Sequence, residues 1–283
     1  MSPRAVSRGV IFITGTSTGI GRAAAERLAK AGYDVIPGIR RPDTLPEPIK
    51  EPVTIDLADP DSIGPATQQV LDRADGNLVA VVNNAGYSVS GPCESLSVDD
   101  WRAQVEVNLF GHIAITGALL PALLANKGRI VNIGSIGGRF ASPFIAPYNA
   151  SKFAVRGWTD AMRVELAPHG VKVILIEPGS VDTAIWGKGK TQADEQLSRL
   201  TPEQQERYGK QVAGAMKLVD YVSTHGITAD KCAAVIEQAI TTSRPKGRYV
   251  VGTDARVQAA ASMLPVRFTD RFTQRMLRRM SKG

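Results

Sequence analysis

The sequence has few cysteines and no long apolar run. Its two cysteines, Cys93 and Cys232, are too few for a disulfide framework and lack metal-binding spacing. Because no stretch of about 18 consecutive apolar residues occurs, we expect no membrane-spanning helix. The first nine residues carry charge and lead directly into an apolar segment, which is not typical of a signal peptide. These absences favour a cytoplasmic protein with reduced thiols and no metal.

Composition places the chain among ordinary globular proteins. Its 283 residues are 43% hydrophobic and 22% charged, enough for a large core in one or two domains. The net charge of +7 is concentrated near the C-terminus, where six basic residues stand against one acid between residues 265 and 283. Since no aromatic platform or known nucleic-acid module accompanies this charge, we do not expect nucleic-acid binding.

Short apolar segments alternate with helical patterns along the chain. Predicted strands cover residues 10–14, 34–39, 53–55, 79–82, 129–133, 172–176 and 248–251. Predicted helices cover residues 19–31, 98–124, 148–167 and 229–241, and another helix opens at Asp59-Pro60. Continuous apolar strands separated by helices indicate a parallel sheet covered on both faces. We therefore predict an α/β fold with a doubly wound parallel sheet (a Rossmann fold) in a single domain, residues 8–252, and a C-terminal helical extension, residues 253–283.

A glycine-rich turn follows the first predicted strand and opens the first predicted helix. It reads Thr14-Gly15-Thr16-Ser17-Thr18-Gly19-Ile20-Gly21. Glycines let the backbone approach a pyrophosphate closely, and a helix N-terminus offers free N–H groups and a positive dipole. The turn therefore predicts a dinucleotide site, with a tight strand–helix turn that binds no ligand as the alternative.

Tyr148 and Lys152 stand four residues apart on a predicted helix and so share one face. A neighbouring ammonium favours phenolate, so we expect the pKa of Tyr148 to lie below its usual value of about 10. A phenol with a lowered pKa suits proton exchange with an alcohol or carbonyl. The spacing alone is also common on ordinary amphipathic helices.

Together these motifs resemble the short-chain dehydrogenase/reductase family, in its compact branch. The matching residues follow the family's order and comprise the glycine turn, Asp56, Asn83-Asn84-Ala85-Gly86, Asn108, Ser135, Tyr148-x-x-x-Lys152 and Pro178-Gly179. The resemblance covers all but the C-terminal part of the chain. It implies hydride transfer between a nicotinamide cofactor and an alcohol or carbonyl compound.

The resemblance also implies four catalytic residues. Tyr148 would be the general acid/base, and Lys152 would lower its pKa and hydrogen-bond the nicotinamide ribose. Ser135 would hydrogen-bond the substrate oxygen, and Asn108 would hold a water that links the lysine to solvent.

The implied cofactor contacts come from every part of the sheet edge. Asp56 would face the adenine amino group, and Thr183 would contact the nicotinamide carboxamide. The full predicted set is Gly15, Thr16, Ser17, Thr18, Gly19, Ile20, Gly21, Arg40, Asp56, Leu57, Asn84, Ala85, Gly86, Tyr148, Lys152, Pro178, Gly179, Val181 and Thr183.

The end of the second predicted strand indicates which cofactor is bound. Relatives that bind NAD end this strand with an acid that bonds the ribose hydroxyls. Here Ile39 takes that position and Arg40 and Arg41 follow. A guanidinium pairs with a 2′-phosphate that a carboxylate would repel, so we predict NADP(H). The alternative is that both arginines are solvated loop charges.

Residues 184–226 are predicted to form the substrate cover. The run from Glu177 to Trp186 and the Ile39-Arg40-Arg41 strand end resemble hydroxysteroid and retinol dehydrogenase-like members of the family. The implied substrate is a lipophilic alcohol or ketone, such as a steroid, retinoid or long-chain aldehyde, although the apolar residues of the cover could equally be packing residues. Two other functions remain open: a 3-ketoacyl thioester reductase of lipid synthesis and a non-catalytic NADP-sensing regulator. The complete set of four catalytic residues favours an enzyme.

The C-terminal segment has an amphipathic pattern of its own. Phe268, Phe272, Met276 and Met280 recur every fourth residue, beside a stripe formed by Arg267, Arg271, Arg275 and Arg279. Such a helix suits the surface of an anionic membrane. It would equally suit docking on its own domain or on a second subunit. The resemblance implies a homo-oligomer, either a dimer or a tetramer.

Overall fold

The computed structural model describes residues 8–41, 51–182 and 197–280. Its main sheet has seven parallel strands in the order β3-β2-β1-β4-β5-β6-β9. The strands are β1 (Val10–Thr14), β2 (Asp34–Ile39), β3 (Val53–Thr54), β4 (Leu78–Asn83), β5 (Arg129–Ile133), β6 (Lys172–Pro178) and β9 (Arg248–Val251). The predicted doubly wound parallel sheet is confirmed.

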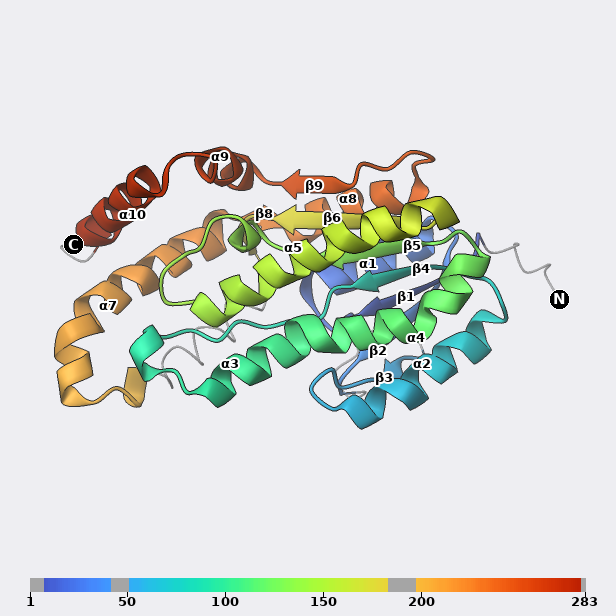
Figure 1. Cartoon of the computed structure of the whole chain (residues 1–283), viewed down its shortest axis with the longest axis horizontal. Coiled ribbons are helices and arrows are strands. Elements are labelled where there is room, and N and C mark those ends of the chain that lie inside the picture. The colour runs from blue at the N-terminus through green and yellow to red at the C-terminus, as the bar shows by residue number, and fades with distance from the viewer. Residues whose placement is uncertain (1–7, 42–50, 183–196, 281–283) are drawn as a thin grey trace.

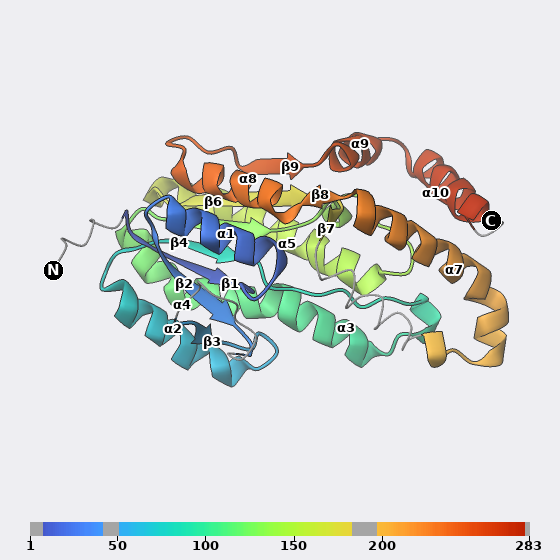
Figure 2. The same ribbon diagram turned by 180° about the vertical axis from the view of Figure 1, so that it is seen from behind.

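Helices cover both faces of the sheet (Figures 1 and 2). One face packs against α2 (Pro60–Ala74), α4 (Gly111–Ala125) and α5 (Ala146–Leu166). The other packs against α1 (Gly19–Lys30) and α8 (Ala229–Thr241). Because the strands are parallel, their carboxyl ends meet at one edge. In Figure 1 this edge faces the end of the molecule that holds α7 (Pro202–His225) and α10 (Val266–Met280).

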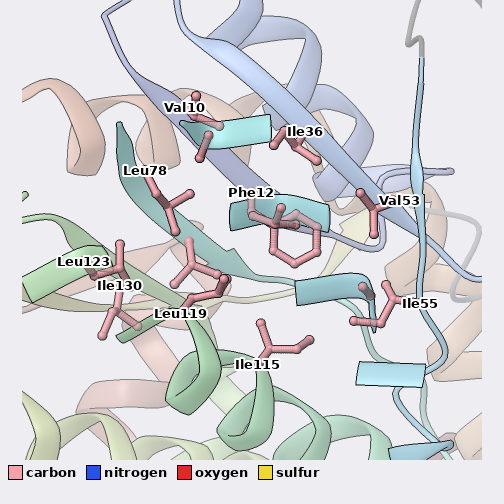
Figure 3. Packing of buried hydrophobic residues seen from close by; sticks show 14 of the residues in the cluster. Val10, Phe12, Ile36, Val53, Ile55, Leu78, Ile115, Leu119, Leu123 and Ile130 are labelled. Atoms are coloured by element: carbon pink, nitrogen blue, oxygen red, sulfur yellow. The ribbon is translucent and has the colours of Figure 1, made fainter. Parts of the chain in front are cut away.

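A hydrophobic core between the sheet and helices α2 and α4 holds the strands, and so their carboxyl ends, in place. Phe12 lies at its centre and is fully buried, and Ile115 and Leu119 of α4 approach the sheet beneath it (Figure 3). Removing such side chains from water is the main driving force for holding α4 against the sheet. The strand ends above this layer are therefore held at fixed positions.

The helical stretch Val98–Ala125 differs from the single helix predicted for residues 98–124. It consists of α3 (Val98–Val105), a π-helical turn (Glu106–Phe110) and α4. An inserted residue produces such a turn, and Asn108 lies inside it. By length and composition this 28-residue stretch could cross a membrane, which the lack of a continuous apolar run did not predict. Its apolar residues Ile115, Leu119 and Leu123 are instead buried against the sheet.

The sequence patterns did not predict α7 as a helix. Thr201 caps its N-terminus and forms a capping box with Gln204. Two short parallel strands pair with each other: β7 (Val181–Asp182), which precedes α7, and β8 (Ile227–Thr228), which follows it. The predicted helical C-terminal region is confirmed as α9 (Thr253–Ala261) and α10, and α10 packs against α7. Thr183 and the front of the predicted substrate cover, up to residue 196, lie outside the described residues.

Candidate active site

The glycine turn and the segment after β4 are in direct contact at the carboxyl edge. Gly15 and Gly19 have φ angles of 72° and 60°, a region that favours glycine. A Cβ atom on Gly15 would lie 2.8 Å from the Cα of Ala85. A Cβ atom on Gly21 would collide with the amide nitrogen of the Asn84 side chain. Any larger residue at these positions would separate the two segments.

Thr14 holds these two segments together. Its hydroxyl accepts hydrogen bonds from the backbone N–H groups of Asn84 and Ala85, both at 3.0 Å. The Asn84 side chain donates to the carbonyl oxygen of Thr14 at 2.9 Å. Asn83, in contrast, is buried and donates to Asn132 and Thr116 in the core. Of the two neighbouring asparagines, only Asn84 therefore belongs to the edge.

The N-terminus of α1 has the properties of an anion site. Its N-cap residue Thr18 makes no side-chain hydrogen bond to the helix, and no acid lies in the first turn. The first N–H groups of a helix need acceptors and carry positive partial charge. Thr16 is fully buried and its hydroxyl bonds the carbonyl of Gly38, so its side chain braces the turn. A dinucleotide pyrophosphate fits this backbone cradle.

Residues predicted to contact the adenosine lie beside the cradle. Arg40 is exposed immediately after β2, and no acid takes its place. It lies close enough to Tyr87 for its charge to lower the pKa of that phenol, against a larger rise caused by burial. The carboxylate of Asp56 accepts the N–H of Ala58 at 3.0 Å, and Leu57 is buried.

The predicted catalytic side chains Ser135, Tyr148 and Lys152 come together between β5 and α5. Ser135 lies close enough to the Tyr148 phenol to act on its pKa. Lys152 is buried, and its ammonium donates to the carbonyl oxygen of Ile133 at 2.9 Å and lies 5.7 Å from the centroid of the Tyr148 ring. This arrangement requires Gly138, because a Cβ atom there would lie 2.7 Å from the Lys152 carbonyl oxygen.

The expected low pKa of Tyr148 is wrong for the protein side chains alone. Burial raises the pKa of Tyr148, and the hydrogen bond with Ser135 lowers it by less. Burial also lowers the pKa of Lys152 to about 8, since the ammonium loses water. The lysine charge is directed at a backbone carbonyl rather than at the phenol. Tyr148 is consequently protonated at neutral pH.

Asn108 connects the π-helical turn to the other segments. Its side chain accepts from the N–H of Tyr87 and donates to the Tyr87 carbonyl and to Ser151, each at 3.1 Å. The Ser151 hydroxyl donates in turn to the carbonyl of Tyr148 at 2.7 Å. In this structure the Asn108 side chain therefore fixes the first turn of α5 and the loop after β4.

The turn after β6 is held by a residue that the sequence patterns did not single out. Asp254, in the first turn of α9, accepts the N–H of Ser180 at 2.8 Å. A Cβ atom on Gly179 would collide with the Asp254 carboxylate. Gly179 also donates to the carbonyl of Val251 at 2.9 Å. The predicted nicotinamide-framing turn, with Pro178 and Val181, is thus braced by the C-terminal extension.

A largely buried ion pair joins the segment after Ser135 to β6. Arg139 follows the Ser135 loop and donates to both carboxylate oxygens of Glu177, at 2.7 Å and 2.5 Å. Glu177 is 1% exposed and immediately precedes Pro178. A two-pronged pair fixes orientation as well as distance. It ties the loop of Ser135 to the end of β6, and the sequence offered no periodic signal for it.

A separate cavity of about 180 Å³ lies at the opposite edge of the sheet, beside Arg8, Tyr33 and Lys127. It shares no residue with the predicted site.

Comparisons with known proteins agree with this geometry. Residues 9–194 match the short chain dehydrogenase family. The chain belongs to the short-chain dehydrogenase/reductase family. Among its relatives are the NADPH-dependent 3-dehydrocapnine reductase of Ornithobacterium rhinotracheale (32% identical, covering 95% of this chain and 98% of the relative) and retinol dehydrogenase 5 of Mus musculus (32%, 92% and 86%). A third is the 3-ketodihydrosphingosine reductase of Bacteroides thetaiotaomicron (31%, 89% and 91%).

Solved structures of this short-chain dehydrogenase family superpose over nearly the whole chain. A short-chain dehydrogenase from Streptomyces avermitilis has a TM-score of 0.76 at 26% identity and covers 98% of this chain and 99% of its own. One from Burkholderia cenocepacia, in complex with NADP, has a TM-score of 0.70 at 26% identity, with 92% and 95% covered. The predicted family, fold and enzyme class are confirmed.

The buried side chain of His112 makes the stability of this short-chain dehydrogenase depend on pH. Its ring is buried and lies 3.4 Å from the Thr14 hydroxyl. Burial, and secondly the charge of Lys152, lower its pKa from 6.5 to about 3. Because the unfolded chain binds this proton more readily, stability is complete above pH 6.5 and is lost as the pH falls towards 3.

We therefore expect acidification to destabilise the wild type more than His112→Gln, by roughly 2 kcal/mol between pH 7 and pH 5. Urea unfolding of both proteins across this range measures the difference. Parallel pH dependences of the two proteins would contradict a buried neutral histidine.

The hydrogen bond from Ser180 to Asp254 should be needed for catalysis. Asp254→Ala leaves the Ser180 N–H without its acceptor and frees the turn predicted to frame the nicotinamide. We expect kcat to fall roughly tenfold or more, with a smaller change in NADPH affinity, because misplacement affects the reacting geometry first.

Asp254→Asn retains an acceptor and should restore most of kcat, while Asp270→Ala on α10 is the control. Steady-state kinetics and NADPH fluorescence titration separate the two effects. A variant in which affinity alone is lost would contradict the positioning role.

Proposed function

We propose that this chain reduces a lipophilic ketone or aldehyde with NADPH, or runs the reverse oxidation, with Tyr148 as the general acid/base. The observation that carries the proposal is the meeting of Ser135, Tyr148 and Lys152 at the sheet edge that also holds the glycine cradle. A glycine cradle alone would serve any dinucleotide, and a tyrosine–lysine pair alone would serve many helix faces. Their juxtaposition supports one reaction, in which hydride and proton are transferred at a single carbonyl.

NADP(H) is the cofactor. An NADP complex and an NADPH-dependent reductase are among the relatives, and both agree with the cofactor predicted from Arg40. We further propose that the exposed guanidinium of Arg40 binds the 2′-phosphate, since β2 ends without an acid. The pyrophosphate would lie on the N-terminus of α1.

The protonated phenol of Tyr148 is the form that the reduction would use. NADPH supplies the hydride that adds to the carbonyl carbon. The protonated phenol of Tyr148 would give its proton to the carbonyl oxygen, and Ser135 would donate a hydrogen bond to that oxygen. The phenolate that remains would be stabilised by the neighbouring Lys152 ammonium. Asn108 would keep the first turn of α5, and with it the phenol, in position.

The lipophilic substrate class rests on relatives and on the cover. Relatives are named as a retinol dehydrogenase and a 3-ketodihydrosphingosine reductase. In the described part of the cover, α7 directs Val212 inward, where it is 6% exposed. Arg207, near the N-terminus of α7, forms an ion pair with Glu94 in the segment after β4. This ion pair attaches α7 to that segment.

Oligomerisation would use a different surface. Phe110 is 51% and Phe153 is 44% exposed, and Ile113 beside them is also exposed. They come from the π-helical turn, α4 and α5. We propose that this face pairs with a second copy of the chain.

The substrate proposal is tested by following NADPH oxidation with ketosteroids, retinal, long-chain aldehydes and acetoacetyl thioesters. We expect turnover of a steroid, retinoid or long-chain aldehyde. Tyr148→Phe should abolish that turnover and leave NADPH binding largely intact, because it removes only the transferable proton. Turnover confined to the thioester would indicate a ketoacyl reductase, and tight NADPH binding with no turnover on any substrate would indicate a sensor.

The role of Arg40 is tested by its alanine variant. Arg40→Ala should weaken NADPH binding about tenfold or more and leave NADH binding nearly unchanged, because only NADPH carries the 2′-phosphate. Titration with each cofactor measures the ratio, and Arg102→Ala provides a control for loss of one surface charge. Equal weakening of both cofactors would show that Arg40 does not bind the phosphate.

A further inference from the structure

We propose that α10 and the segment before it bind the surface of an anionic lipid bilayer. The proposal goes beyond the proposed reaction and does not depend on it. It begins from where exposed apolar side chains gather. Six of the eleven large hydrophobic side chains that are exposed in the described part of the chain lie between residues 257 and 272, namely Val257, Met263, Leu264, Val266, Phe268 and Phe272.

The contact with α7 leaves these side chains free for another partner. Thr269, Thr273 and Met276 are half-buried on the side of α10 that packs against α7. Phe268 is 48% and Phe272 is 66% exposed, although a helix docked only on its own domain would bury them. The predicted apolar ridge is thus divided, with Met276 turned inward and the two phenylalanines turned outward.

Arginines share the outward side of α10. At 3.6 residues per turn, Phe268 and Phe272 fall within one half of the helix surface together with Arg267, Arg271, Arg275, Arg278 and Arg279. Each of these arginines is exposed, and Asp270 falls outside that half. Arg267 also lies over the Phe268 ring, 5.0 Å from its centroid. An anionic, partly apolar surface is complementary to this face.

A bilayer surface fits this composition better than a second copy of the chain. In a two-fold symmetric contact the same patch meets itself, so the arginine cluster would face its own copy. Anionic headgroups instead pair with the arginines, while the aromatic rings enter the boundary with the acyl chains. Short helices of this kind bind reversibly and depend on both contributions.

The position of α10 connects this surface with the active site. It lies at the end of the molecule that the strand carboxyl ends face (Figure 1). Between it and the site, α9 contacts the Ile136–Gly138 turn next to Ser135. A bilayer on this face would therefore lie at the same end of the molecule as the carboxyl ends of the strands.

The test is flotation of the full-length protein with vesicles. We expect binding to phosphatidylcholine vesicles that contain phosphatidylglycerol, weaker binding at high salt, and roughly tenfold weaker binding to phosphatidylcholine alone. Arg271→Glu with Arg275→Glu, and separately Phe268→Ser with Phe272→Ser, should each weaken binding by about tenfold or more.

Controls separate this surface from net charge and from the reaction. Lys30→Glu with Arg244→Glu makes the same change in charge away from α10 and should leave vesicle binding nearly unchanged. NADPH binding by all variants in solution should equal that of the wild type, which reports folding independently of any substrate.

Three outcomes would overturn the proposal. They are equal binding to neutral and anionic vesicles, no binding to either, and binding that survives both α10 variants. Light scattering of the wild type and the variants measures whether a second copy of the chain occupies this face instead. If the phenylalanine variant dissociates an oligomer and the wild type binds no vesicles, the occupant of this face is a second copy.

Discussion

The arrangement of the candidate active site depends on how the buried ammonium of Lys152 is hydrogen-bonded. A buried charge must be hydrogen-bonded or it becomes neutral. Lys152 as a residue is 5% exposed, and burial lowers its pKa to about 8. The carbonyl of Ile133 at the end of β5 supplies the hydrogen bond. That bond fixes α5 relative to the sheet, so Tyr148 on the same helix face is placed by it. The buried ring of His112 is neutral in the field of the same charge.

Close backbone contact is the second condition for the site. The glycine turn, the segment after β4 and the loop after β5 must all approach one another at the same edge. Gly15 and Gly21 allow the first contact, and Gly138 lets α5 approach the loop of Ser135. Hydrogen bonds from Thr14 and Asn108 then fix the separations that the glycines permit. The order of these segments in the sequence therefore does not predict how closely they approach one another in the site.

The sequence predicts those parts of the protein in which local pattern determines structure. The strands are continuous apolar runs, and all seven predicted strands are present in the expected sheet. Most of the proposed catalytic and cofactor-binding residues can be identified because they lie just after a strand or, like Tyr148 and Lys152, on one helix face; Asn108, inside the π-helical turn, has neither signal. Asp254 and the Arg139–Glu177 pair cannot, since they act across large separations in the sequence and have no repeating pattern.

The pKa of Tyr148 shows why site chemistry is harder to predict than site position. Spacing correctly places an ammonium near a phenol, but burial of the phenol and the direction of the lysine hydrogen bond decide the sign of the shift. Spacing likewise reveals the apolar ridge of α10 without showing that α7 covers only part of it. In both cases the sequence names the groups, and the three-dimensional environment determines what each group does.

The C-terminal extension is more than an addition to a finished domain. Through Asp254 its first helix, α9, holds the turn after β6. Its second helix, α10, packs against α7, which lies in the predicted substrate cover. A force on α10 would therefore reach two parts of the site by short, packed paths. Such coupling requires that the cover or the turn has two arrangements of similar free energy.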